Sequence, residues 1–333
     1  MSIFRKSLTL YKKRGLKYLI DTFPLFIIQR YIRMADRYQA FVNRNLPFDR
    51  RFIIKNILGN KMYLDSADLG ISSDLLLDGI REVLHTETVR NEIKEGDIIV
   101  DIGANIGYYA LQESKLVGDK GRVYAIEPVP ENFDLLSRNI TLNGYSNIVA
   151  YNLAIGNEIG TVTMNFDPNH RNLSSVKTVN VHPMKGRDIP ITTLDDFLKD
   201  KPNPNVIRMD VEGFERNIIK GMEKTLDKNL PLTLLIEIHF GNTESPAFKA
   251  ETITMLQTLK DAGFKITDGA FERWAKIRSN HRILCKLWRF FEKRRAGSTP
   301  PSGHLIFSID EIMANATILN DDWGELEACF KRI

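Results

Sequence analysis

The residues best placed to do chemistry surround two glycines that follow an apolar run. Residues 97–102 form this run, which contains Asp101 and leads into Gly103, Asn105 and Gly107 before a helical pattern begins. A strand that passes through a glycine turn into a helix predicts a loop whose backbone lies against a nucleotide. We therefore expect Asp101, Gly103, Asn105 and Gly107 to bind a cofactor.

Polar residues also follow the next two predicted strands. The apolar strand 122–127 ends in Glu127, and Asn152 lies near the end of the segment 147–154. In open parallel sheets the ligand binds beyond the carboxyl ends of the strands, and an acid after the second strand binds a ribose diol. We predict that Glu127 takes ribose hydroxyls, although it could instead be an acid at the start of the next helix. Asn152 or Ala154 is then expected to meet the adenine.

The spacing of the glycines separates two classes of cofactor. Dinucleotide sites favour G-x-G-x-x-G, in which the middle glycine lets the backbone approach a pyrophosphate. Here Asn105 stands between Gly103 and Gly107, and Asp101 precedes the turn. A carboxylate repels a pyrophosphate but attracts the sulfonium and ammonium groups of S-adenosylmethionine (SAM). The sequence therefore favours SAM and disfavours a dehydrogenase.

Four further polar residues lie at the ends of the fourth and fifth predicted strands. Asp210 and Glu212 follow the fourth strand, while Glu237 and His239 alternate along the fifth and so share one face. Methyl transfer to oxygen needs an acceptor hydroxyl that is held close and relieved of its proton. We predict that these four residues are catalytic, with Asp210 the preferred base and His239 a second candidate.

Three of these side chains allow a different form of assistance. Asp210, Glu237 and His239 supply oxygen and nitrogen ligands of the kind that hold a divalent cation. A bound cation would activate the acceptor oxygen without a protein base. The residue types leave base and metal assistance open.

Taken in order, the motifs resemble those of one family. They are DIGANIGYY at 101–109, AIEPVPENF at 125–133, MDVEGFE at 209–215 and LIEIH at 235–239. Together with a lead-in at 60–70, they are similar to the FkbM-type SAM-dependent methyltransferases, from about Asn60 to Ile266. The resemblance implies a class I methyltransferase fold and O-methylation of a sugar or another small-molecule hydroxyl. It also links the segment 209–215 to catalysis.

The order of elements predicts the fold class. From residue 97 onward strands and helices alternate, which indicates an α/β fold with a parallel sheet and right-handed crossovers. With the resemblance, we expect the Rossmann-like sheet of class I SAM-dependent methyltransferases, with an antiparallel edge strand. Strands are expected at 97–102, 122–127, 147–154, 205–210 and 232–238, with helices near 107–117, 131–143, 214–227 and 246–262. Additional strands are expected at 161–166, 265–267 and 305–308, the last two pairing at the sheet edge.

Three regions divide the chain. Residues 1–50 are predicted to form a basic amphipathic helical extension, and residues 51–95 a lead-in hairpin and helix. Residues 96–333 are predicted to form the methyltransferase domain, with a basic helical segment inserted at 271–303. The polar stretch 171–175 could be a lid over the substrate or a surface turn.

Charge is unevenly distributed along these 333 residues, whose net charge is +4. Residues 1–51 hold twelve Lys or Arg against three acids, and residues 271–295 hold nine against two. Both segments also carry large apolar side chains, a combination typical of helices that lie in an anionic membrane surface. A helical arm packed on the core or on a second subunit of an oligomer explains the pattern equally well.

The sequence also bears on the compartment. The apolar stretch 18–28 is too short to span a membrane, and it contains Asp21 and Pro24, so neither a signal peptide nor an anchor is predicted. Cys285 and Cys329 have no metal or redox spacing. We expect a cytoplasmic protein, peripheral on the inner face of the cell membrane if its basic segments bind lipid.

Two other functions fit part of the pattern. A nucleic-acid methyltransferase would place the basic arms on phosphates, but phosphates avoid acids such as Asp210 and Glu212. A non-catalytic, SAM-binding membrane adaptor would not need the acids at the strand ends. The leading prediction is therefore a SAM-dependent O-methyltransferase that acts on a hydroxyl of a sugar, a glycan precursor or a related small molecule, including lipid-linked forms.

Overall fold

The computed structural model of the protein describes the greater part of the chain. The described residues are 27–28, 30–32, 34–166, 174–175, 186–228, 230–239, 246–271, 303–304, 308–315 and 325–332. The predicted basic insertion lies outside them except at residues 271 and 303. Residues 1–26, residues 171–173 of the predicted lid and residues 305–307 of the predicted edge strand also lie outside them.

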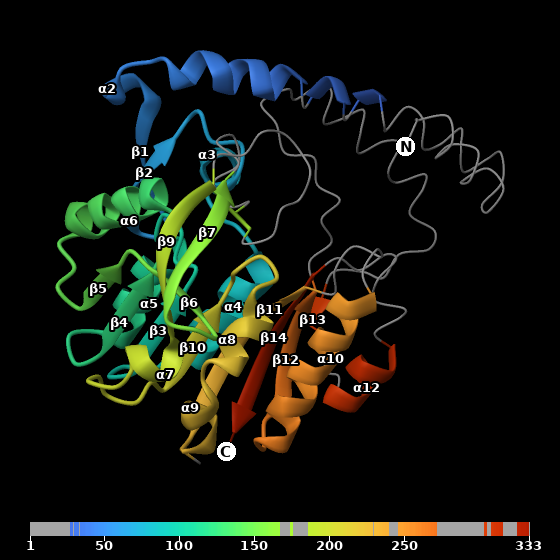
Figure 1. Ribbon diagram of the computed structural model, residues 1–333. Coiled ribbons are helices and arrows are strands. Elements are labelled where there is room, and N and C mark those ends of the chain that lie inside the picture. Colours follow the sequence, from blue (N-terminus) through green and yellow to red (C-terminus); the bar gives the residue numbers. More distant parts are fainter. Residues whose placement is uncertain are drawn as a thin grey trace, which may run out of the picture.

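A mostly parallel sheet forms the centre of the described structure (Figure 1). Its strands are β3 (Ile98–Ile102), β4 (Arg122–Ile126), β5 (Ile148–Tyr151), β10 (Val206–Met209), β11 (Leu232–His239), β12 (Lys265–Phe271), β13 (Gly303–His304) and β14 (Glu325–Arg332). Their order is β13-β12-β14-β11-β10-β3-β4-β5. The strands from β11 to β5 are parallel, and β14 runs antiparallel to β11 and β12. The predicted parallel sheet with an antiparallel strand is thus confirmed.

Helices cover both faces of this sheet (Figure 1). They are α3 (Ile71–Asp78), α4 (Val83–Glu92), α5 (Tyr108–Val117), α6 (Pro130–Asn143), α7 (Leu194–Phe197), α8 (Glu215–Lys220), α9 (Glu223–Asp227), α10 (Pro246–Asp261) and α12 (Ile309–Asn315). The short helix α2 (Phe48–Arg51) lies instead beside the first strand of the hairpin described next. Val100 and Ile102 belong to one buried cluster while Ile99 belongs to another, as the alternation of a strand requires. Because both faces are covered, β3 is almost wholly apolar, and the fully buried Asp101 is its exception.

Two smaller sheets complete the described part. One is the hairpin of β1 (Phe52–Ile57) and β2 (Asn60–Asp65), and the other contains β6 (Ala154–Gly156), β9 (Gly186–Thr193), β7 (Gly160–Phe166) and β8 (Ser174–Ser175), in that order. The predicted lead-in hairpin is confirmed: Ile57 pairs with Asn60, and Leu58 and Gly59 both have positive φ, as tight hairpin turns prefer. The third strand, predicted to reach residue 154, instead ends at 151, and the chain re-enters a different sheet as β6.

The sheet edge differs from the sequence prediction. Residues 265–267 were expected to pair with 305–308, but β12 pairs along most of its length with β14. β13 contributes two residues, opposite Ala270 and Phe271. Leu326, Ala328 and Phe330 alternate in β14 with more polar residues, which is typical of a strand. However, β11 and β12 are distant from β14 in the sequence, and an alternating pattern does not determine which strands pair with one another.

The helix predicted at 214–227 is also divided, because α8 ends before Gly221 and α9 begins at Glu223. A Cβ on Gly221 would lie 1.9 Å from the carbonyl oxygen of Gly156. This close approach of two backbones requires a glycine and brings α8 against β6, at the side of the cavity described below.

Residues 27–28, 30–32 and 34–44 are helical, and we call them the N-terminal helix. It lies across the top of the molecule in Figure 1, beside the β1–β2 hairpin. Asn43 Nδ2 donates to the carbonyl oxygen of Ser66 at 2.9 Å and so ties the helix to the segment before α3. None of the described helices is long and apolar enough to cross a membrane.

Candidate active site

The loop of residues 103–107, which follows β3, takes its shape from contact with the end of β10. Gly103 has a φ of 86°, and a Cβ there would lie 2.0 Å from the carbonyl oxygen of Asp210. No other residue fits this position, because both the conformation and the space exclude a side chain. Gly107, with a φ of 92°, caps the start of α5, so the loop from β3 ends at a helix N-terminus as the sequence predicted.

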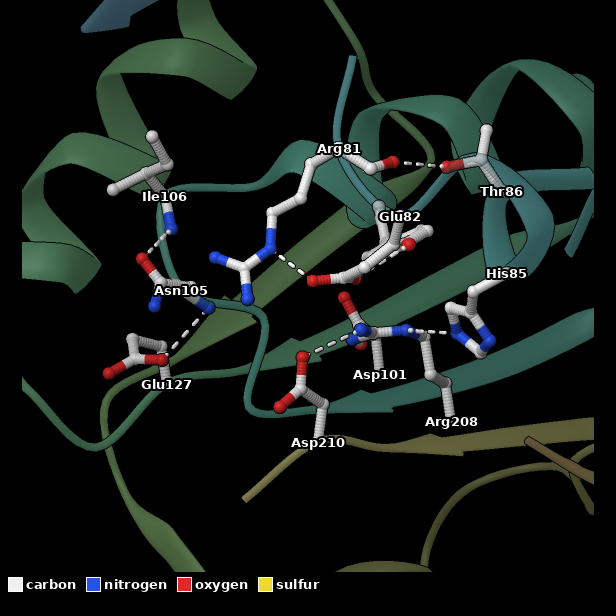
Figure 2. Close-up of polar contacts among 11 residues, drawn as sticks. Arg81, Glu82, His85, Thr86, Asp101, Asn105, Ile106, Glu127, Arg208 and Asp210 are labelled. Atoms are coloured by element: carbon white, nitrogen blue, oxygen red, sulfur yellow. Dashed lines mark hydrogen bonds and ion pairs between the residues drawn. The ribbon is translucent and has the colours of Figure 1, made fainter. Parts of the chain in front are cut away.

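Asn105 occupies the middle of this loop in the left-handed conformation, with a φ of 51°. Its backbone N–H donates to Glu127 Oε2 at 2.8 Å, and its side-chain Oδ1 accepts from the N–H of Ile106 at 2.9 Å (Figure 2). The loop after β3 is therefore fastened to the acid after β4. An asparagine suits this place because its side chain bonds locally and tolerates positive φ.

Glu127 is a nearly buried carboxyl group at the carboxyl end of β4. Its Oε1 accepts from the N–H of Val129 at 2.8 Å, and the side chain of Asn132 donates to the same oxygen at 3.5 Å. Burial raises the pKa of Glu127 to about 7, against the opposing effect of the backbone donors of Val129 and Asn105. Its charge near neutral pH thus depends on what occupies the space beside it.

A buried ion network lies beneath the ends of β3 and β10. Arg208 donates to Asp101 Oδ1 at 3.0 Å and to Asp210 Oδ2 at 2.8 Å, and its Nε lies 3.4 Å from His85 Nε2 (Figure 2). Burial lowers the pKa of His85 to about 3, helped by Arg208, so this imidazole is a neutral acceptor. Burial raises the pKa of Glu113, also fully buried, well above its ordinary value, with Asp101 adding to the effect. A bidentate guanidinium is suited to joining two carboxylates in this way.

Asp210 and Arg208 are the members of this network that line the cavity, and Asp210 is its carboxylate there. Burial alone would favour its neutral form, but Arg208, a hydrogen bond with the side chain of Glu237, and Arg81 together hold the pKa of Asp210 well below its ordinary range. Asp210 is therefore a carboxylate at neutral pH. The predicted pair Asp210 and Glu237 is brought together by neighbouring strands β10 and β11.

Arg81 and Glu82 approach the same place from the turn between α3 and α4. They form a buried ion pair, and the Tyr109 hydroxyl donates to Glu82 Oε2 at 2.9 Å. Figure 2 shows the Arg81 guanidinium between Asn105 and Asp210. The Arg81 guanidinium thus lies near both the Asp210 carboxylate and the loop that contains Asn105.

One cavity of about 340 Å³ unites these groups. It lies beyond the carboxyl ends of β3, β4 and β10, the usual ligand position in open α/β sheets, and its volume is within the range of about 300–1,000 Å³ found for small-molecule sites. Glu212, Arg216 and Phe248 extend its lining toward α8 and α10. Arg216 lies 3.5 Å from the centre of the Phe248 ring and also pairs with Glu251.

Strained backbone is concentrated around this cavity. Four described residues other than glycine have a positive φ, and three of them, Glu82, Asn105 and Glu212, line the cavity. Each costs on the order of 1 kcal/mol or more, and such strain is concentrated at functional sites because the surroundings must enforce it. Gly213, with a φ of 91°, follows Glu212 and continues the unusual turn after β10.

Several predicted site residues have other surroundings. Asp101 is completely buried and contacts Arg208, while its Oδ2 has no hydrogen-bond partner among the residues that the structure describes. Asn152 Nδ2 donates to the carbonyl oxygens of Glu127 and Pro128 at 2.8 and 3.0 Å, so it holds the loop after β4. The neighbouring Leu153 and Ala154 line the cavity instead. His239 ends β11, but its side chain lies outside the described part.

The predicted metal set is not supported. Within the described ranges, no group of three or more His, Cys, Asp or Glu side chains is arranged to hold a cation. Asp210 instead contacts Arg208 and Glu237, and these contacts stabilise a carboxylate without a cation.

The sequence analysis missed Arg81, Glu82, Arg208 and Arg216. Arg208 carried a usable signal, since a charged residue two positions before Asp210 in an apolar strand shares its face. Arg208 is also in register with Asp101 of β3. Arg81 and Glu82 carried no comparable signal, because their place in the site depends on how the α3–α4 segment packs over the sheet.

The strand order and the cavity beyond the ends of its parallel strands are those of the class I SAM-dependent methyltransferase fold. Residues 101–266 match the family described as Methyltransferase FkbM domain, so this part of the chain is a domain of that family. The family resemblance seen in the motifs is thus confirmed.

Named relatives are also methyltransferases. Hexuronic acid methyltransferase AglP of Haloferax volcanii is 29% identical over 153 residues, which are 45% of this chain and 59% of that protein, less than two thirds of its length. Methyltransferase 1 of Beauveria bassiana is 26% identical over 266 residues, or 73% of this chain and 92% of that protein. A solved SAM dependent methyltransferase from Aquifex aeolicus aligns with 60% of this chain and 86% of its own at 18% identity and a TM-score of 0.34.

Proposed function

We propose that the protein transfers the methyl group of SAM to a hydroxyl of a sugar or a related small molecule. The observation that carries the proposal is that one cavity is lined both by Gly103, Asn105 and Glu127 and by Asp210. A methyl donor and an acceptor hydroxyl must meet in one enclosed place for in-line displacement.

On the cofactor side, the loop of Gly103 and Asn105 would lie along the methionine part of SAM, and Glu127 would accept the ribose hydroxyls. Each Glu127 oxygen already takes a backbone donor, which fixes its orientation and leaves further lone pairs for the diol. Leu153 and Ala154 would contact the adenine. Asp101 would act through Arg208, by fixing the guanidinium that holds Asp210.

On the acceptor side, Asp210 would accept a hydrogen bond from the reacting hydroxyl. Its lowered pKa makes it a weak base toward a neutral alcohol. As the O–CH3 bond forms and the S–CH3 bond breaks, however, the hydroxyl oxygen becomes positive and its proton passes readily to the carboxylate. S-Adenosylhomocysteine is the other product. Glu237 would position Asp210 through their hydrogen bond.

Polar groups in the rest of the cavity favour a polyhydroxylated acceptor. Arg81, Glu212 and Arg216 bring donors and acceptors to its wall, as recognition of sugar hydroxyls or a sugar carboxylate requires. The printed name of one relative, a hexuronic acid methyltransferase, points to the same class. His239 remains a second candidate base at the end of β11.

The test is transfer of labelled methyl from SAM to a panel of neutral sugars, sugar acids and lipid-linked sugars. We expect methylation of at least one acceptor, and Asp210→Asn should lower kcat by about 10²–10⁴-fold while S-adenosylhomocysteine affinity changes little. Asp134→Asn, at an exposed carboxylate paired with Arg138, is the matched control and should leave kcat unchanged. Cofactor binding without methylation of any hydroxyl acceptor would instead support the adaptor hypothesis.

A further inference from the structure

The N-terminal helix presents one side to the body of the protein. Ile32 and Ala40 are 2% and 1% exposed, and Asn43 reaches the backbone of Ser66. These residues lie on one side of a helix with 3.6 residues per turn. The contacts fix which way the opposite side points.

That opposite side carries a stripe of large apolar residues. Moving along the helix in alternate steps of four and three residues, the stripe contains Ile27, Tyr31, Met34, Tyr38 and Phe41, which are 51%, 61%, 63%, 70% and 63% exposed. A surface helix normally turns its apolar stripe toward the core. Here the largest apolar side chains face outward, and a contiguous exposed stripe of this kind marks an interaction surface.

Basic residues follow one edge of the stripe. Arg30 lies four residues before Met34, and Arg37 lies four residues before Phe41, so each arginine is a neighbour of a stripe residue on the helix surface. Both arginines are exposed. The other edge carries Ala35 and Val42, so within the described helix no acid flanks the stripe.

We propose that the N-terminal helix docks on the surface of an anionic lipid bilayer, with this stripe buried at the level of the headgroups and the arginines against lipid phosphates. Tyrosine and arginine suit this depth, since each has an apolar body and a polar end. The stripe supplies apolar area and the arginines supply attraction to negative charge, the two terms on which binding of interfacial helices depends. A second copy of the helix would bring one described acid, Asp36, which lies four residues from both Ile32 and Ala40 and so on the side opposite the stripe, away from Arg30 and Arg37.

Docking would also place the active site near the lipid surface. The helix is tied to Ser66, shortly before Ile71 of α3, which lines the cavity. The bilayer contact itself does not depend on the proposed reaction, because it concerns a surface outside the cavity.

The test is co-sedimentation of the full-length protein with vesicles of phosphatidylcholine alone or mixed with phosphatidylglycerol. We expect binding to the mixed vesicles and much weaker binding to the neutral ones. The triple variant Tyr31→Ser, Tyr38→Ser, Phe41→Ser should lower the partition coefficient on anionic vesicles roughly tenfold or more. The control Ile159→Ser, Leu230→Ser removes exposed apolar residues elsewhere and should bind as the wild type does. Arg30→Gln with Arg37→Gln should weaken anionic binding roughly tenfold.

Three results would overturn the proposal. The first is full binding of the triple variant to anionic vesicles, and the second is equal binding of the wild type to neutral and anionic vesicles. The third is a wild-type dimer, seen by light scattering, that the triple variant dissolves while vesicle binding is absent. S-Adenosylhomocysteine affinity is measured on every variant and reports whether its cavity is folded. Loss of vesicle binding with this affinity retained concerns the bilayer contact alone and leaves the proposed function untouched.

Discussion

Glu127 combines a structural and a ligand-binding task in one buried carboxyl group. Its oxygens hold the backbone of Asn105 and Val129, while burial raises its pKa to about 7. The carboxylate is the form that can accept two ribose hydroxyls, so cofactor binding should favour ionisation. Below pH 7 the free protein must first lose a proton from Glu127 in order to bind.

We therefore expect S-adenosylhomocysteine affinity to fall as pH drops through 7, with Kd at pH 6 roughly tenfold above its value at pH 8, since one pH unit is a factor of ten in protonation. Glu127→Gln should bind more weakly at pH 8 and show little change between pH 8 and pH 6. Calorimetric titration at several pH values measures both. A wild-type Kd that is flat over this interval would refute the role of Glu127.

Substituting Gly103 and Gly96 separates two effects of an added side chain on stability, the lack of space for it and the unfavourable backbone conformation. Both have positive φ, at 86° and 88°, but a Cβ on Gly96 meets nothing within 4 Å, whereas one on Gly103 meets the backbone of Asp210. Gly96→Ala should lower the free energy of unfolding by about 1–2 kcal/mol. Gly103→Ala should lower it further and abolish cofactor binding. Urea unfolding of both variants checks this, and equal losses would contradict the close contact of β3 and β10.

At the scale of elements, Arg208 joins β3 to the end of β10 through a buried guanidinium. Its removal in Arg208→Met would leave the buried Asp101 without its ion-pair partner and take from Asp210 one of the two arginines that stabilise its charge, at a cost of about 3–5 kcal/mol in unfolding free energy. Arg138→Met, which removes an exposed partner of Asp134, should cost about 1 kcal/mol or less. Denaturant unfolding compares them, and similar costs would show that the buried network does not hold the strands.

The sequence predicts the strands that have a clear local pattern of apolar residues. It does not predict features that depend on contacts between residues far apart in the chain. The apolar runs of β3, β4, β10 and β11 are buried on both faces, and burial of that kind leaves a clear sequence signal. β14 takes its place between β11 and β12 only through pairing far along the chain. The break at Gly221 depends on a backbone contact with Gly156 that no local pattern encodes.

The candidate site shows the same division. Gly103, Asn105, Glu127 and Asp210 follow strand ends, and topology brings strand ends together. Arg81 and Glu82 enter from a turn whose position depends on packing over the sheet. For Asp101, the residue type suggested a direct contact with the cofactor, but burial beside Arg208 gives it a partner within the protein.

For the whole molecule, the central claim is that this cavity binds SAM for methyl transfer. The most direct measurement is calorimetric titration of the full-length protein with S-adenosylhomocysteine, with NADH run in parallel. We predict binding of S-adenosylhomocysteine with a micromolar Kd, on the order of −8 kcal/mol, and no binding of NADH. Failure to bind S-adenosylhomocysteine, or binding of NADH in its place, would contradict the account and the roles assigned to Gly103, Asn105 and Glu127.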